Sequence, residues 1–301
     1  MNLATIDIGT NTTLLLVARA YPTVAVLEER AEITRLGRGI GREGALAPDA
    51  IARTLAVLRD FAAAARRHGA RVAAVGTEAL RRAANADAFL VPAAEILGAE
   101  VEVIDGEREA ALTYRAVVTS FPAVRSGELV VVDIGGGSTE IVLATHGEIR
   151  FRTSLPLGSV RLTEAVVHQD PPGSAEQRSV AEAVDAAIGA VPFAHAPATL
   201  VGVAGTVTSL AAMSLELASY DPARVHGHKL SRAQLGLEIT RLAGATQAER
   251  ERMIGLDPRR ADVIYAGAVI LDRIAAAAGV DEIRVSDRGI RWGLLYELIP
   301  T

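Results

Sequence analysis

Two short segments of the sequence place an aspartate before glycines and hydroxyl or amide side chains, the residue types that bind phosphate groups. The first is Asp7-Ile8-Gly9-Thr10-Asn11-Thr12, and the second is Asp133-Ile134-Gly135-Gly136-Gly137-Ser138-Thr139-Glu140. Glycine lets the backbone approach an anion closely, and backbone N–H groups, hydroxyls and amides then donate to its oxygens. The aspartates can hold a divalent cation or its water. We therefore predict two phosphate-facing turns beside a metal site.

The second segment is the more specific of the two. Its three consecutive glycines follow a Val-Val-Val-Asp strand and are costly in backbone entropy, so we expect a ligand to come close to them. Asp133 and Glu140 bracket the turn and are predicted to bind Mg²⁺, while the glycine N–H groups bind a phosphate. The alternative is a glycine-rich turn with solvated acids. A plain hairpin turn is the alternative for the first segment.

A third glycine turn, Gly202-Val203-Ala204-Gly205-Thr206-Val207-Thr208-Ser209, follows a strand and opens a helix. Backbone N–H groups at a helix start can bind phosphate or a nucleotide. The hydroxyl side chains can equally cap the helix. Both interpretations stay open for this turn.

The elements that position the first two turns follow the same layout twice. Apolar or alternating residues predict strands around each turn. These strands cover residues 3–8, 13–18, 24–33, 128–133, 139–144 and 148–154. A duplicated unit would bring two phosphate-facing hairpins to opposite sides of one cleft. Chance likeness of two hairpins is the alternative.

Helical spacing of apolar residues and short apolar runs predict the remaining elements. Helices are expected at 48–67, 86–97, 175–190, 206–219, 232–242 and 261–278, and strands at 71–75 and 101–104. A chain of 301 residues exceeds the usual size of a single core. We therefore predict an α/β protein with domains at 1–121 and 122–301, in which the last helix can pack back on the first domain.

Composition argues against several classes of function. Of the residues, 50% are hydrophobic and 22% are charged, as in a globular protein with a large core. The absence of cysteine excludes disulfides, thiolate metal sites and cysteine nucleophiles. A net charge of -5 argues against a general nucleic-acid-coating protein, and neither a basic leader nor a membrane-spanning run is found. We expect a cytoplasmic protein that binds neither nucleic acid nor membrane.

Six blocks of the sequence resemble, in order, the exopolyphosphatase and guanosine pentaphosphate phosphohydrolase (Ppx/GppA) family in its short, two-domain form. They are DIGTNT at 7–12, GTEALRRAAN at 76–85, IDGEREA at 104–110, DIGGGSTE at 133–140, RADVIYAG at 260–267 and SDRGIRWG at 286–293. The glycine turns also resemble the actin, sugar kinase and heat-shock ATPase superfold. The resemblance implies the two-domain actin-like ATPase (ASKHA, ribonuclease H-like) fold, with mixed sheets flanked by helices and an interdomain cleft.

The resemblance also implies roles for single residues. Glu109 matches the catalytic glutamate, a general base for the attacking water, and Asp133 and Glu140 match the acidic pair near the metal and the water. Arg81 matches an arginine of the phosphate channel. The other implied phosphate-binding residues are Thr10, Asn11, Thr12, Gly135, Gly136, Gly137, Ser138, Thr139, Gly205 and Thr206, and the implied metal ligands are Asp7, Asp133 and Glu140.

Two residues beside Glu109 depart from the family pattern. Asp105 stands where the family often has serine, and Arg108 stands where it often has a second acid. Glu107 is therefore the alternative base. Taken alone, Glu109 also fits a solvated acid at a helix N-terminus.

The family implies an exopolyphosphatase that releases terminal phosphate from inorganic polyphosphate by metal-assisted attack of water. Guanosine pentaphosphate (pppGpp) 5'-phosphohydrolase is the alternative, because no residue decides between the two substrates. Mg²⁺ or another divalent cation is the implied cofactor. The resemblance also leaves open a bound monovalent cation and a homodimer. An ATP-dependent small-molecule kinase shares the loops, and a non-catalytic actin-like switch module is the alternative outside the enzymes.

Two further groups of residues have less specific interpretations. Five arginines can line an entrance channel or form a solvated surface: Arg35, Arg38, Arg42, Arg81 and Arg82. His226 and His228 flank a glycine and could suggest a metal pair. Loop histidines are more often polar surface, so we assign them no role.

Overall fold

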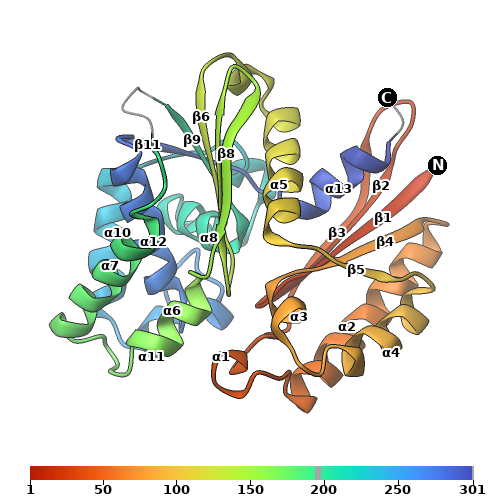
Figure 1. Cartoon of the computed structure of the whole chain (residues 1–301), viewed down its shortest axis with the longest axis horizontal. Helices are drawn as coiled ribbons and strands as arrows, with labels where there is room; N and C mark the ends of the chain where they lie inside the picture. The colour runs from red at the N-terminus through yellow and green to blue at the C-terminus, as the bar shows by residue number, and fades with distance from the viewer. Residues whose placement is uncertain (194–197, 300–301) are drawn as a thin grey trace. The chain divides into compact units, whose positions relative to one another are not determined.

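The structure, a computed structural model, describes residues 1–193 and 198–299, apart from the side chain of Arg42. It divides into two compact units. Figure 1 colours the chain by residue number, from red at the N-terminus to blue at the C-terminus. Unit 1 comprises residues 1–116 and 290–301, and unit 2 comprises residues 117–289. Each unit is built on one mixed sheet flanked by helices, which confirms the predicted α/β class.

The sheet of unit 1 has the strand order β3-β2-β1-β4-β5. The strands are β1 (Asn2–Ile8), β2 (Thr12–Arg19), β3 (Ala25–Ile33), β4 (Arg71–Gly76) and β5 (Val101–Val103). β1 runs antiparallel to β2 and parallel to β4, with Ile8 opposite Gly76. The first aspartate-glycine turn therefore lies at the same sheet edge as the carboxyl end of β4.

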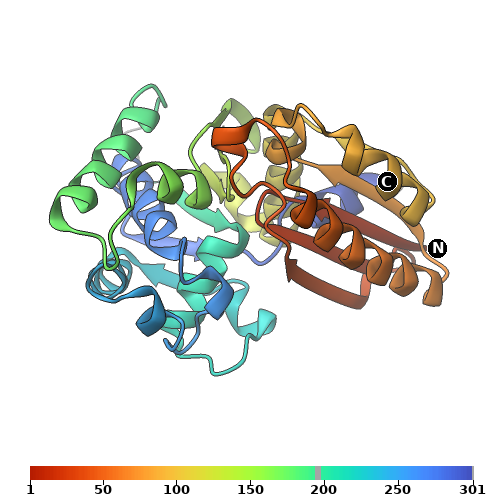
Figure 2. The ribbon, with the colours of Figure 1, turned by 90° about the horizontal axis from the view of Figure 1, so that it is seen from below.

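Helices cover both faces of this sheet. Successive residues of a strand point to opposite faces, and apolar residues of β1 on both faces are buried. The helices are α1 (Ile40–Glu43), α2 (Pro48–Arg67), α3 (Glu78–Arg82), α4 (Asp87–Leu97), α5 (Gly106–Ser120) and α13 (Ile290–Leu298). Ile6 of β1 clusters with Leu58 of α2 and Phe89 of α4, and Figure 2 shows these two helices side by side. Leu3 of β1 clusters instead with Trp292 of α13.

The sheet of unit 2 has the strand order β10-β11-β9-β6-β7-β8. The strands are β6 (Glu128–Ile134), β7 (Thr139–Thr145), β8 (Glu148–Leu155), β9 (Thr199–Val203), β10 (Lys229–Ser231) and β11 (Glu282–Val285). β6 runs antiparallel to β7 and parallel to β9, just as β1 does to β2 and β4. The predicted repeat of strand, glycine-rich hairpin and strand is confirmed.

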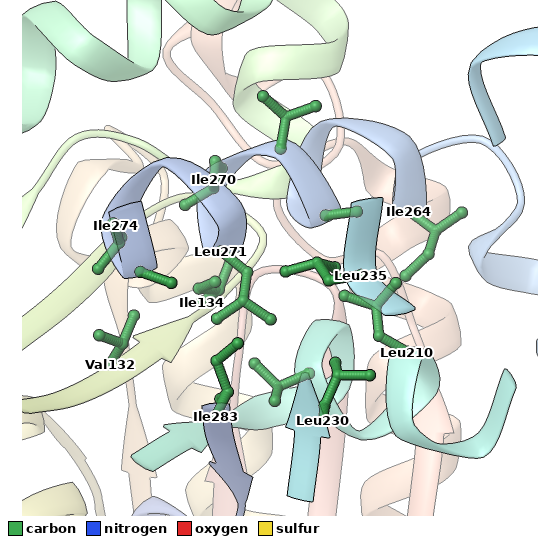
Figure 3. Packing of buried hydrophobic residues seen from close by; sticks show 14 of the residues in the cluster. Val132, Ile134, Leu210, Leu230, Leu235, Ile264, Ile270, Leu271, Ile274 and Ile283 are labelled. Atoms are coloured by element: carbon green, nitrogen blue, oxygen red, sulfur yellow. The ribbon is translucent and has the colours of Figure 1, made fainter. Parts of the chain in front are cut away.

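One face of this second sheet is covered by helices that share a large apolar core. The helices of unit 2 are η1 (Pro122–Ser126), α6 (Ser159–Val166), α7 (Ser174–Ile188), α8 (Ala204–Ser214), α9 (Pro222–Val225), α10 (Arg232–Gly244), α11 (Gln247–Arg250), η2 (Pro258–Arg260) and α12 (Ile264–Ala277). Val132 and Ile134 of β6 cluster with Leu210 of α8 and Leu271 of α12 (Figure 3). This packing fixes the end of β6, where the glycine turn begins.

Two helices begin or end at other residues than the sequence predicted. The predicted helix 206–219 is α8, which ends at Ser214. The helix stops because Glu216 takes a left-handed φ of 49° and Leu217 N donates back to Ala212 O at 3.0 Å, an arrangement typical of helix ends. The predicted helix 261–278 begins at 264, after the short η2 turn. Within residues 1–193 and 198–299, no helix has the length and apolar character needed to cross a membrane.

Candidate active site

The turn between β1 and β2 is held by backbone hydrogen bonds to its carbonyl groups. Gly9 N donates to Thr12 O at 3.0 Å, and Thr34 N and Arg35 N donate to Asn11 O at 3.0 and 2.9 Å. A Cβ at Gly9 would lie 2.9 Å from Thr12 O, so the tight turn requires glycine. The protein itself therefore sets the backbone of this turn before any ligand binds.

Two buried side chains of this turn differ in their hydrogen bonds. The Oγ1 hydroxyl of Thr10 donates to Glu78 Oε2 at 3.2 Å, so its single proton is in use and its lone pairs remain. Asn11 is 7% exposed, and among the described residues no acceptor lies within hydrogen-bonding reach of its Nδ2. A buried amide donor without an acceptor is unfavourable. An anionic ligand would supply that acceptor.

Glu109 lies near the start of α5 and is only 3% exposed. β4 and β5 are adjacent parallel strands, so α3, which follows β4, and α5, which follows β5, begin at the same edge of the sheet. Arg81 of α3 reaches Glu109 at this edge. Its Nη1 donates to the Glu109 carboxylate and also to Ile104 O, at 2.6 Å.

The residues around Glu109 fix the start of α5. The Asp105 carboxylate accepts a hydrogen bond from Arg108 N at 2.7 Å, the pattern of a helix N-cap, so aspartate performs here the capping that a serine can perform. The side chain of Arg108 pairs with Glu297 of α13. Glu107 is exposed, whereas Glu109 is buried against an arginine.

The carbonyl groups of the glycine turn in unit 2 are bonded to the start of α6. Ser159 N donates to Gly135 O at 2.9 Å, and Arg161 N donates to Gly136 O at 3.0 Å. Arg161 Nε donates to Gly137 O at 2.9 Å. The C=O and N–H groups of a trans peptide point in opposite directions. The N–H groups that follow these carbonyls therefore point away from α6.

These N–H groups belong to Gly136, Gly137 and Ser138, which are buried. Within the described part of the chain, they donate to no protein acceptor. Buried N–H groups require a partner, and successive amides that face one way form an anion-binding nest. Gly158 allows α6 to come this close, because a Cβ there would lie 2.4 Å from Gly136 O. The turn thus has the geometry of an anion site.

Two buried carboxylates stand beside this turn. Asp133 of β6 lies directly opposite Glu140 of β7 in the sheet register, so both side chains project from the same face. They are 6% and 3% exposed, and Ser154 Oγ donates to Glu140 Oε1 at 2.7 Å. Two buried like charges repel each other. A cation that prefers oxygen ligands, such as Mg²⁺, would offset this repulsion, so the residues fit the predicted metal.

The third turn, between β9 and α8, has a strained backbone. Ala204 takes a φ of 70°, which residues other than glycine rarely adopt. A Cβ at Gly205 would lie 2.2 Å from Arg260 Nη2, so a guanidinium covers this glycine. Thr206 Oγ1 donates to a backbone carbonyl at the end of β6 at 3.3 Å. The N-cap residue of α8 is Val203, which has no side-chain oxygen to cap the helix; the hydroxyl of Ser209 instead donates to Gly205 O within the first turn of α8, at 2.7 Å.

Comparison with known proteins assigns the family. The model of the Ppx/GppA phosphatase family matches residues 16–301. The chain belongs to this family. It is 39% identical over 314 residues to Exopolyphosphatase 2 of Mycobacterium tuberculosis, with 98% of each chain covered. It is 31% identical over 306 residues to the guanosine-5'-triphosphate,3'-diphosphate pyrophosphatase of Vibrio atlanticus, with 98% of this chain and 59% of the relative covered.

Solved structures of the Ppx/GppA family have the same fold. A Ppx/GppA enzyme of Aquifex aeolicus is 37% identical, with a TM-score of 0.83 and 99% of each chain covered. An exopolyphosphatase of Cytophaga hutchinsonii is 26% identical, with a TM-score of 0.92 and 99% and 98% of the two chains covered. The predicted fold, two mixed sheets flanked by helices as in Ppx/GppA and actin-like proteins, is confirmed.

The predicted site residues of this Ppx/GppA protein fall into two sets. Unit 1 contains Asp7, Thr10, Asn11, Thr12, Arg81 and Glu109; unit 2 contains Asp133, Gly135, Gly136, Gly137, Ser138, Thr139, Glu140, Gly205 and Thr206. Among the described residues, no group of three or more acidic or histidine side chains is arranged to hold a metal. The predicted metal set draws Asp7 from unit 1 and the acidic pair from unit 2. It stays a prediction, as do the catalytic and phosphate-binding roles.

Sequence reasoning missed two supports of the turns. Glu78 is buried between Thr10 and Arg82, whose Nη1 donates to Glu78 Oε1 at 3.1 Å. The start of α6 holds the glycine turn, and its signal in the sequence is Gly158, which follows a Leu-Pro-Leu segment. Thr139 also supports this turn, because its buried hydroxyl donates to Leu157 O at 2.6 Å.

The side chains of Arg35, Arg38 and the two histidines that the sequence analysis singled out take no part in the hydrogen bonds described above for the turns and for Glu109. Arg35 is half-buried and Arg38 is exposed, and the side chain of Arg42 lies outside the described residues. His226 stacks on Phe121 with ring centroids 4.7 Å apart, and burial, with a smaller effect of Arg288, lowers its pKa to about 4. His228 Nε2 lies 3.1 Å from the hydroxyl oxygen of a serine in α8. Stacking and hydrogen bonds thus account for the two histidines.

Proposed function

We propose that the protein is an exopolyphosphatase that hydrolyses the terminal phosphoanhydride bond of inorganic polyphosphate. The observation that carries the proposal is the buried glycine turn of unit 2. Among residues 1–193 and 198–299, its three outward-facing amides have no protein acceptor, and they stand beside the buried pair Asp133 and Glu140. Membership of a phosphatase family and similarity to an exopolyphosphatase along the whole chain support the same reaction.

In this mechanism the terminal phosphoryl group binds to the amides of Gly136, Gly137 and Ser138, with the Asn11 amide as a further donor. Glu109 accepts a proton from the attacking water. The water oxygen forms a bond to phosphorus as the bond from phosphorus to the bridging oxygen breaks, and the shortened polyphosphate leaves with that oxygen. Positioning and electrostatic stabilisation carry such phosphoryl transfers, without a covalent intermediate.

Asp133 and Glu140, with Asp7, are the residues that would hold Mg²⁺ or another divalent cation. A bound cation supplies charge neutralisation at the phosphate oxygens. The buried carboxylate pair supports this assignment, because the repulsion between its members favours a cation. Removal of divalent cations by a chelator is expected to abolish phosphate release, and added Mg²⁺ is expected to restore it.

The second candidate is hydrolysis of guanosine pentaphosphate (pppGpp) at its 5' end, which presents the same terminal phosphoanhydride. A pyrophosphatase named for that nucleotide is similar along 98% of this chain. Phosphate release from polyphosphate and from pppGpp, measured separately and in competition, distinguishes the two substrates. A kinase would instead form a phosphorylated small molecule only when ATP is present. The cytoplasmic location, a bound monovalent cation and the homodimer belong to this same proposal.

The decisive experiment is the substitution Glu109→Gln, which keeps the shape of the side chain and removes the base. Loss of general base catalysis is expected to lower phosphate release by about 10²–10⁴-fold. The matched control is Glu107→Gln, an exposed acid two residues earlier in the same helix. Circular dichroism and thermal unfolding check that both variants fold. Wild-type activity in Glu109→Gln, with an intact fold, would overturn the role of Glu109.

A further inference from the structure

The guanidinium of Arg81 in α3 makes two hydrogen bonds with neighbouring protein groups. Its Nη1 donates to Ile104 O at 2.6 Å and to the carboxylate of Glu109. A guanidinium Nη carries two hydrogens, so these two contacts use the full donor capacity of this nitrogen. Ile104 is the residue after β5, and its N–H donates to Gly76 O at the end of β4 at 3.0 Å. The position of Arg81 Nη1 is thereby set by the sheet edge.

The same contacts restrict Glu109. Its carboxylate is buried, with a side-chain exposure of 4%, and meets the planar guanidinium of Arg81. A planar guanidinium fixes the direction of the bonds it donates, unlike the rotating ammonium of lysine. One carboxylate oxygen is thus held, and the orientation of the other follows from it. A general base needs such control, because it must lie within hydrogen-bonding reach of the water that it deprotonates.

We propose that Arg81 is a positioning residue that acts on the reaction through Glu109. This inference rests on the proposed function, in which Glu109 is the general base. It replaces the role of direct phosphate ligand that the family resemblance implies for Arg81. The two roles differ in their kinetic consequences: a phosphate ligand contributes to substrate binding, whereas a positioning residue has no effect once the base itself is removed.

The test is a double-mutant cycle of Arg81→Met with Glu109→Gln, measured as phosphate release from polyphosphate with Mg²⁺. Misplacement of a catalytic group by about 1 Å costs on the order of 10²-fold, so Arg81→Met alone is expected to lower kcat by roughly 10–10²-fold, with KM changed less than about threefold. In the Glu109→Gln background the same substitution is expected to change kcat less than about twofold, because coupled residues act non-additively.

Two further variants sharpen this cycle. Arg81→Lys keeps the charge but not the planar donor group, and is expected to recover only part of kcat. Should Arg81→Met unfold, Arg81→Lys takes its place in the cycle, where it is likewise expected to have no effect beside Glu109→Gln. Arg59→Met, on the exposed side of α2, is the control for loss of an arginine in the same unit and is expected to leave kcat and KM unchanged.

The outcomes separate the inference from the proposed function. An equal loss of kcat from Arg81→Met in both backgrounds would overturn the inference, as would a loss confined to a raised KM, which is the behaviour of a phosphate ligand. Wild-type activity in Glu109→Gln alone would overturn the proposed general base instead. A loss from Arg81→Met that disappears beside Glu109→Gln supports both.

Discussion

A methyl group added at Gly158 tests whether α6 sets the phosphate-binding turn of unit 2. A Cβ at this residue would lie 2.4 Å from Gly136 O, 2.5 Å from Gly136 C and 2.6 Å from Gly137 N. Ordinary contacts between such atoms are about 3.5 Å, so relief requires a movement of about 1 Å. Gly158 has φ -150° and ψ 162°, an extended conformation that alanine adopts freely. The effect of Gly158→Ala is therefore steric alone.

The atoms that must move belong to the turn that we propose to bind the phosphoryl group. A displacement of about 1 Å at a reacting centre costs on the order of 10²-fold in rate, and overpacking costs about 1–3 kcal/mol of stability. We therefore expect Gly158→Ala to lower kcat/KM for polyphosphate by roughly 10²-fold. Thermal unfolding should show a destabilised but folded protein.

The matched control for Gly158→Ala is Gly236→Ala, in the middle of α10 of the same unit. A Cβ at Gly236 meets no atom of the described residues within 4 Å, and alanine is the better helix former by about 1 kcal/mol. This control is expected to unfold at a higher temperature and to keep wild-type kcat/KM. The reasoning about α6 is refuted if Gly158→Ala also keeps kcat/KM within about twofold of wild type.

Two further predictions concern stability. Gly293→Ala places a Cβ 2.0 Å from Leu112 O, so it should push α13 away from α5 and lower the free energy of unfolding by about 1–3 kcal/mol; an unchanged melting temperature would contradict this packing. Burial lowers the pKa of His226 from 6.5 to about 4, so the unfolded state binds a proton first as pH falls. Stability is expected to be full above pH 6.5 and to decrease by about 1–2 kcal/mol between pH 6.5 and 4, after a discount for partial exposure. Urea unfolding across this range should show a flatter profile for His226→Gln than for wild type.

The sequence predicted the strands and turns well because their signals are local. Residues 129–132 form a continuous apolar run, which is typical of a strand buried on both faces, and the three glycines at 135–137 indicate a close approach to the backbone. Pairing of β6 with β9 joins segments far apart in the chain, and no local signal in the sequence predicted it.

The supports of the site could not be predicted in the same way. The bond from Thr10 to Glu78 and the pairing of Arg81 with Glu109 depend on which helices start at one sheet edge. Neither α3 nor the contact of α6 with the glycine turn has a periodic signal, because α3 is a single short turn. The family pattern supplied Glu109, and burial beside Arg81 distinguishes it from the exposed Glu107.

Unit 1 is built from both ends of the chain, and this affects the order in which the protein can fold during synthesis. Unit 1 is interrupted after residue 116 and is completed only by residues from 290 onward. Until α13 leaves the ribosome, the sheet face bearing Leu3 and Leu16 lacks Trp292 and Leu295, which cover it in the folded protein. Unit 2 is continuous and can fold meanwhile, since domains generally fold as units during synthesis. A nascent chain therefore carries an unprotected apolar face for as long as the whole of unit 2 takes to be translated.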